Sequence, residues 1–118
     1  MKENIIKDKS FKFAIRVVNV YKLLVSERKE FVMSKQLMRS GTSVGANIRE
    51  AQNGESKADF IHKLGIAQKE ADETLYWLEL LKETKYLKND EFESMHHDGT
   101  EILKILRTII INAKTKNS

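Results

Sequence analysis

The sequence predicts an all-α protein: an up-down-up-down antiparallel four-helix bundle that forms a single domain over residues 1–118. The chain has no proline, and its mix of Lys, Glu, Leu, Ile and Ala favours helices. Apolar residues recur at spacings of three and four residues in four successive segments, which is typical of one helix face. The connections between these segments are short, so consecutive helices should pack as antiparallel neighbours.

The first predicted helix spans about residues 8–27. Its expected core line is Phe11, Ala14, Val18, Tyr21 and Val25. The second predicted helix spans about residues 34–53, with Ser34 as its N-cap and Gly54 as a C-terminal stop. Its expected core line is Leu37, Gly41, Val44, Ile48 and Ala51.

The third predicted helix spans about residues 56–86 and opens with Ser56 and Asp59 in an approximate capping box. Its expected core line is Phe60, Leu64, Ala67, Ala71, Leu75, Leu78 and Leu81. The fourth spans about residues 89–115, with Asn89 as the expected N-cap. Its expected core line is Phe92, Met95, Gly99, Ile102, Leu106, Ile109 and Ala113.

More apolar residues are present than these four lines contain. Those outside them include Ile15, Val17, Val20, Leu24, Ile66, Trp77, Leu80, Leu103, Ile105 and Ile110. They indicate either a broad buried face or a subunit interface. In the second case Trp77, with Leu80 beside it, is the expected anchor, because tryptophan is enriched at interface hot spots.

The segment 40–51 combines helical spacing with two glycines, Gly41 and Gly45. Glycine inside a helix costs about 1 kcal/mol relative to alanine, so the backbone here is expected to lie close to another helix. The same segment matches the G-x-S-x-G pattern of a hydrolase nucleophile elbow at Ser43. That motif requires a turn between a strand and a helix, so we expect Ser43 to lie in a helical seam and not to react.

The charge of the chain is uneven along its length. Residues 1–54 contain 11 Lys and Arg against 5 Asp and Glu, a net of +6, whereas residues 55–118 contain 10 against 12, a net of −2. Basic residues form candidate nucleic-acid-binding stripes on the first two helices: Lys12, Arg16, Lys22, Lys35, Arg39 and Arg49. Antiparallel pairing is expected to merge them into one patch, which would suit a phosphate backbone. The alternatives are solvated helix surface or complementary faces between identical subunits.

Several classes of function lack their residues. The chain has no cysteine, which excludes disulfides and thiolate chemistry, and it has no phosphate-binding glycine loop. The pairs Glu93/His96 and Asp59/His62 have metal-ligand spacing but should lie at opposite ends of the bundle, too far apart to share an ion. We therefore expect no enzyme activity, metal or cofactor. No secretory signal or membrane-length apolar run is found, so a cytoplasmic location is expected.

The order and spacing of several residues resemble a known family over about residues 8–112. The helix-two part of the pattern is Gln36-Leu37, Arg39-Ser40, Ser43-Val44, Asn47-Ile48 and Glu50, and it continues with Ser56-Lys57, Asp59-Phe60-Ile61, Glu73 and Tyr76 to Leu80. This pattern is similar to that of the 23S ribosomal RNA intervening-sequence proteins. The resemblance implies a small four-helix bundle, a homopentameric ring, and association with RNA. It also implies kinship with an accessory protein of diversity-generating retroelements, which binds nucleic acid and a reverse transcriptase.

The resemblance suggests partners and roles for particular residues. Partners would be further copies of the chain, RNA or DNA, and a nucleic-acid enzyme. The helix-two signature is expected to be a packing motif, in which Asn47 and Glu50 hydrogen-bond helix three or four; the motif comprises Ser40, Gly41, Ser43, Gly45, Asn47 and Glu50. A ring requires two different faces to meet, and Asp72, Glu79 and Glu83 could receive a neighbour's basic stripe. Assembly and nucleic acid therefore compete for the same cations, and a purely structural protein-protein module stays open.

Overall fold

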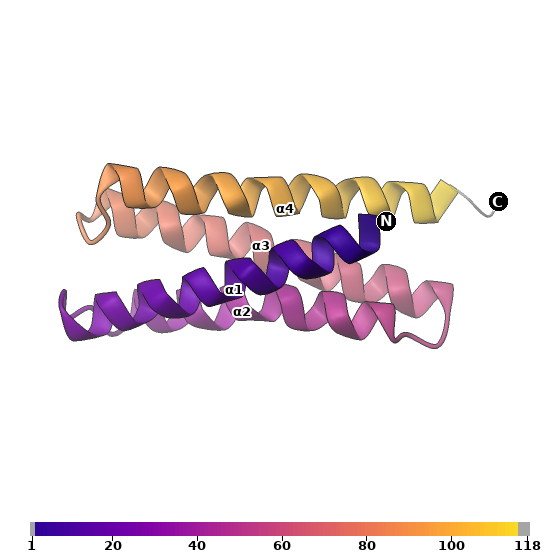
Figure 1. Ribbon diagram of the computed structural model, residues 1–118, viewed down its shortest axis with the longest axis horizontal. Helices are drawn as coiled ribbons and strands as arrows, with labels where there is room; N and C mark the ends of the chain where they lie inside the picture. Colours follow the sequence, from indigo (N-terminus) through magenta and orange to yellow (C-terminus); the bar gives the residue numbers. More distant parts are fainter. Residues whose placement is uncertain (1, 116–118) are drawn as a thin grey trace.

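Four long helices run side by side in alternating directions (Figure 1). The computed structural model describes residues 2–115. Its helices are α1 (Lys2–Ser26), α2 (Met33–Gln52), α3 (Lys57–Glu83) and α4 (Asn89–Thr115). Each helix packs against two others: α2 lies between α1 and α3, and α4 also lies between α1 and α3. The bundle measures 50 × 21 × 20 Å, and the predicted four-helix bundle is confirmed.

The helix N-termini differ in part from the predictions. Helix α1 begins six residues before the expected start at residue 8, because Ile6 belongs to the core. Ser34 is not the N-cap of α2. Val32 holds that position, and its side chain makes no capping bond. The Glu30 carboxylate accepts from the first N–H groups instead. At α3, the predicted cap is confirmed: Ser56 Oγ accepts from the Asp59 N–H at 3.0 Å.

The remaining boundaries also have local causes. Helix α3 stops at Glu83, three residues before the expected end, because Lys85 adopts a left-handed conformation with φ 71°. Asn89 is the first residue of α4 and not its cap. The Glu91 carboxylate reaches back to the Lys88 N–H at 2.8 Å, which satisfies one donor that the helix leaves unpaired.

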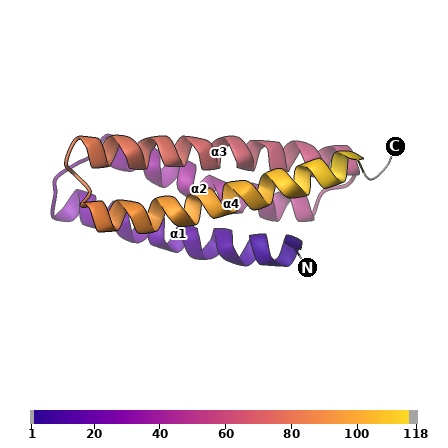
Figure 2. The same ribbon diagram turned by 90° about the horizontal axis from the view of Figure 1, so that it is seen from above.

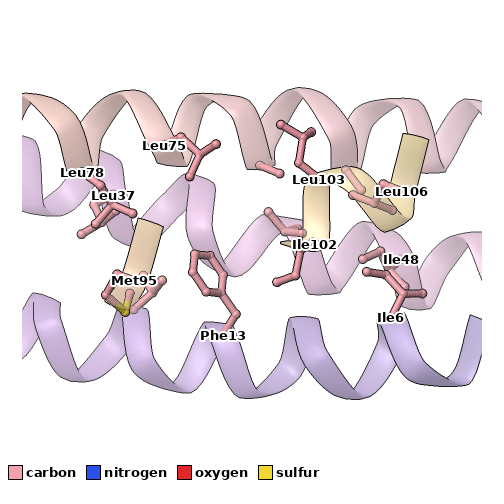
Figure 3. Packing of buried hydrophobic residues seen from close by; sticks show 14 of the residues in the cluster. Ile6, Phe13, Leu37, Ile48, Leu75, Leu78, Met95, Ile102, Leu103 and Leu106 are labelled. Atoms are coloured by element: carbon pink, nitrogen blue, oxygen red, sulfur yellow. The ribbon is translucent and has the colours of Figure 1, made fainter. Parts of the chain in front are cut away.

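The core line of α1 was predicted on the wrong face. Phe11 is 54% exposed, whereas the apolar residues that α1 buries are Ile6, Phe13, Val17 and Leu24. Phe13 points into the centre of the bundle beside Ile102 and Leu75 (Figure 3). Both faces of α1 carry apolar residues at helical spacing, so the pattern alone does not distinguish them. Contact with α2 and α4 selects the second one.

The expected core lines of the other helices are largely confirmed. All five expected core residues of α2 are buried. On α3 the expected core residues from Leu64 to Leu81 are buried, and on α4 those from Met95 to Ile109 are buried. Three expected core residues are only partly buried: Phe60, Phe92 and Ala113. Leu103 and Ile110, which lay outside the expected lines, are also buried. Part of the apolar surplus therefore belongs to a broad core and not to an interface.

The seam between α1 and α2 is close where the glycines predicted it. A Cβ atom on Gly41 would lie 2.8 Å from both methyl carbons of Val17, so no larger residue fits without movement of α1. A Cβ atom on Gly45 would lie 3.4 Å from the Ser10 carbonyl oxygen and Oγ, which is ordinary contact. Close approach of α1 therefore requires glycine at position 41 but not at position 45.

Candidate functional site

The helix-two signature is mainly a set of packing and hydrogen-bonding contacts. Ser40 is fully buried and its Oγ accepts from Thr74 Oγ1 of α3 at 3.0 Å. Ser43 lies inside α2 and its Oγ donates to the Arg39 carbonyl at 2.6 Å, so it is not displayed on a strand-to-helix turn. Asn47 donates within α2 to the Ser43 carbonyl at 2.9 Å, in place of the expected bond to helix three or four. Glu50 does make the expected interhelical bond.

That bond, and a larger network, connect α2 to α3. Lys63 Nζ donates to Glu50 Oε1 at 2.9 Å. Arg39 donates to Glu73 and, at 3.4 Å, to Glu70. Trp77 Nε1 donates to the same Glu73 oxygen at 3.0 Å. The Trp77 bond, together with Arg39, holds the pKa of Glu73 below its usual value despite its partial burial.

Two basic residues of α1, Lys9 and Arg16, reach α4, on another side of the bundle. Lys9 Nζ donates to Glu101 at 2.9 Å, and Arg16 donates to Asp98 and to Ser94 Oγ. Lys12 pairs with Asp8 of its own helix at 3.1 Å. Because Arg16 turns toward α4 and Arg39 toward α3, the two predicted stripes do not form one patch.

A groove separates the outer surfaces of α1 and α2. It encloses about 400 Å³ and is lined chiefly by Phe11, Ala14, Thr42, Gly45, Ala46 and Arg49. The Arg49 guanidinium lies 5.8 Å from the centre of the Phe11 ring, a cation-π distance. Phe11 and Ile15 are 54% and 48% exposed, so α1 presents an apolar surface beside a cation.

The carboxylates predicted to receive a neighbouring subunit lie on α3. Asp72 is exposed. A Glu79 carboxylate oxygen lies 2.9 Å from His96 Nε2, and the Glu83 carboxylate lies 3.7 Å from Lys82 Nζ. Tyr76 stands among them, 55% exposed. Trp77 and Leu80, the expected interface anchors, are each partly buried, and Trp77 packs edge-on against Tyr76.

A structured region that the sequence pattern did not predict lies where the two connections at one end of the bundle meet. Arg28 donates to both carboxylate oxygens of Glu91, at 2.8 and 2.9 Å, and to the Tyr86 carbonyl at 2.7 Å. The connection 27–32 is thereby fastened to the connection 84–88 and to the start of α4. The Arg28 hydrogen bonds are the main cause that lowers the pKa of Glu91 to about 2. We call this group, Arg28, Tyr86 and Glu91, the loop clamp.

Glu30 shapes the first of these connections. Its carboxylate is buried and accepts from the backbone N–H groups of Val32, Met33 and Ser34 at 3.2, 3.0 and 2.6 Å. Burial by itself would raise the pKa of Glu30, but these donors outweigh it and lower the pKa. A negative charge is also favourable at this helix N-terminus. The only sequence signal was the charged run from Glu27 to Glu30, which precedes the apolar Phe31 and Val32.

Between residues 4 and 115, no three His, Asp or Glu side chains come together as metal ligands would. None of the helices over that range has an apolar stretch long enough to cross a membrane.

The fold and these contacts define a four-helix bundle whose helix-two signature packs against α3. Over residues 2–108 the chain matches the family described as 23S rRNA-intervening sequence protein, and it therefore belongs to that family. It is similar to a protein of unknown function from the S23 ribosomal protein family of Bacteroides thetaiotaomicron. The two chains are 63% identical in sequence, and the crystal structure of that protein matches this one with a TM-score of 0.92. The match covers 93% of this chain and 98% of that chain. No curated protein matches the chain.

Proposed function

We propose that the protein is a non-enzymatic adaptor that assembles into a homopentameric ring and binds RNA or DNA for a nucleic-acid enzyme. The observation that carries the assembly is the exposed apolar face of α1, with Phe11 and Ile15, beside the groove that contains Arg49. Single exposed apolar residues are ordinary on a monomer, but a contiguous apolar surface beside a groove is typical of an interaction site.

A complementary face is available on the other side of the bundle. Helix α3 is the one that α1 does not contact, so the outer faces of the two helices point in different directions. The outer face of α3 carries Asp72, Glu79 and Glu83 around the exposed Tyr76. Two different faces that fit each other form a heterologous contact, and repetition of such a contact closes a ring. The family resemblance supports five members.

A purely structural module is the second candidate, and one observation favours it. Lys9, Arg16 and Arg39 are already paired with carboxylates of their own chain. Cations in such pairs are less available to phosphates. Support for nucleic acid comes instead from the net charge of +4 and from the family to which the chain belongs.

The ring is tested by measuring mass in solution for the wild type, Phe11→Glu and Ile111→Glu. Ile111 is the matched control, because it is 59% exposed on α4 and outside the proposed contact. We expect a pentamer for the wild type and the control, and smaller species for Phe11→Glu, because a carboxylate would face the acidic side of α3. A monomeric wild type would refute the ring.

Binding to RNA is tested on the same samples by retention on an immobilised polyanion as salt is raised. Electrostatic binding to phosphates weakens steeply with salt. Salt-dependent retention supports the adaptor proposal, and no retention at low salt leaves the structural module as the function.

A further inference from the structure

One end of the bundle brings together the connections 27–32 and 84–88. Both lie at the same end in two perpendicular views (Figures 1 and 2), and the loop clamp joins them through Arg28. The first turn of α2 begins there too. We call this end, with residues 27–35 and 82–89, the loop end.

Four lysines at the loop end form no salt bridge within the described residues: Lys29, Lys35, Lys85 and Lys88. All four are exposed. Three carboxylates at or beside this end have other partners: Glu30 accepts from the start of α2, Glu91 pairs with Arg28, and Glu83 lies 3.7 Å from Lys82. A hollow of about 390 Å³ also opens here, and it is lined by Lys82, Glu83, Lys85, Leu87, Lys88 and Asn89. Three lysines therefore outnumber one carboxylate, Glu83, around this surface depression.

Two of these lysines occupy backbone positions that favour glycine. Lys29 has φ 56° and Lys85 has φ 71°, and they are the two non-glycine residues with positive φ in the described chain. At Lys85 the turn is a Schellman motif, because the Tyr86 N–H reaches the Leu81 carbonyl and the Lys85 N–H reaches the Lys82 carbonyl; glycine is the usual residue there. A long side chain in the left-handed region is strained, and such strain concentrates where the side chain has a function.

The loop end also displays an aromatic ring. Phe31 is 57% exposed and Val32 is 73% exposed, although both could have been polar in a simple connection. The three N–H bonds to Glu30 fix the turn that carries them. An exposed ring among unpaired cations is the arrangement with which proteins stack a base and hold the adjoining phosphates.

We propose that the loop end is the nucleic-acid site, where Phe31 stacks on an unpaired base and Lys29, Lys35, Lys85 and Lys88 hold the phosphates of a single strand. The inference rests on the proposed binding of RNA or DNA and is independent of the ring, because one chain supplies the whole surface. It places binding at the end of the bundle and not on the α1 and α2 stripes. An anionic membrane would also attract the lysines, but Phe31 and Val32 alone offer little apolar area for insertion.

The phosphate contacts are tested by the salt dependence of affinity for an unpaired RNA oligonucleotide. For single strands, the slope of log K against log salt is about −0.7 for each phosphate neutralised. Lys29→Gln with Lys85→Gln should make the slope shallower by about 1.4. The matched control is Lys69→Gln with Lys104→Gln, two exposed lysines on α3 and α4, which should leave the slope unchanged. Equal effects of both pairs, or an effect of the control alone, would refute the assignment.

Glycine substitution separates a functional role of the lysines from a structural one. Lys29→Gly and Lys85→Gly relieve the left-handed strain, so the thermal midpoint should not fall while RNA affinity does. If the lysines serve only the turns, RNA affinity stays at the wild-type level and the proposal is wrong.

The stacking contact is tested with three changes at one position. Phe31→Ala and Phe31→Leu should each lower affinity for the unpaired RNA about tenfold, whereas Phe31→Trp should preserve it. A duplex of the same sequence should be insensitive to all three, because its bases are already stacked. If the wild type binds the RNA, and both Phe31→Ala and the Lys29→Gln, Lys85→Gln variant bind it as tightly as the wild type does, the loop end is not the binding site. The adaptor proposal survives that result. If wild type binds anionic vesicles and not the RNA, both fail and the surface is a membrane site.

Discussion

Along the sides of the bundle, cations face carboxylates on the adjacent helix, as Arg16 faces Asp98 and Arg39 faces Glu73. At the loop end, Lys29 and Lys85 face solvent without such partners. All four side chains carry a positive charge, and the difference in pairing comes from position. Parallel helix axes hold paired side chains side by side over many residues, whereas residues in a connection extend past the helix ends. Lys29 and Lys85 are therefore available to a partner, whereas Arg16 and Arg39 are held by carboxylates of their own chain.

The largest stability effect should come from breaking the loop clamp, which is the one strongly paired site at the loop end. Arg28→Ala should lower the free energy of unfolding by about 2–3 kcal/mol at neutral pH, because the pKa of Glu91 lies near 2 in the folded protein against 4.5 ordinarily. A carboxylate with a lowered folded pKa stabilises the fold above its unfolded pKa, and that stability is lost as pH falls from about 4.5 toward 2. Denaturant unfolding at several pH values measures both effects.

The control for the clamp is Glu91→Gln in the same series. It should make the dependence of stability on pH weaker over this acidic window, because one titrating group is gone, while Glu30 and Glu73, whose pKa values are also lowered, still titrate. A wild type whose stability does not change between these pH values would show that Glu91 is not held by Arg28.

The next effect concerns the sides and compares two glycines four residues apart. Gly41→Ala should destabilise the protein by about 1–3 kcal/mol, because the added methyl would overlap both methyl groups of Val17. Gly45→Ala should be neutral or stabilising by up to about 1 kcal/mol, since its Cβ has room and alanine favours the helix. Thermal unfolding of the two variants checks this, and equal losses would contradict the difference in packing along the seam.

The smallest effect should come from the ion pairs on the sides. Arg39→Gln should lower stability by no more than about 1 kcal/mol, because Arg39 is half exposed and such pairs contribute little. Its RNA affinity should stay near that of wild type, in contrast to Lys29→Gln with Lys85→Gln. Titration of both variants with the same RNA makes the comparison. A larger loss of RNA affinity in Arg39→Gln would indicate that RNA binds on the side of the bundle.

Much of the fold was predictable because spacing reports which residues share a helix face. The lines through Leu37 to Ala51 and Leu64 to Leu81 are buried as expected, and Gly41 lies in the close seam that its cost implied. The line through Phe11 failed, because α1 has apolar residues on two faces and spacing does not say which face meets the neighbours. The clamp and the Glu30 carboxylate at the start of α2 were missed, because they depend on where connections end in space.

The sequence alone determined the number and type of helices, their antiparallel order and the family, since helix periodicity, short connections and residue order are local properties. The tertiary structure alone decided which side of α1 is buried, which cations are paired and which are free. Those outcomes depend on contacts between residues far apart in the sequence, such as Arg39 with Glu73 and Lys9 with Glu101, and local spacing carries no information about them.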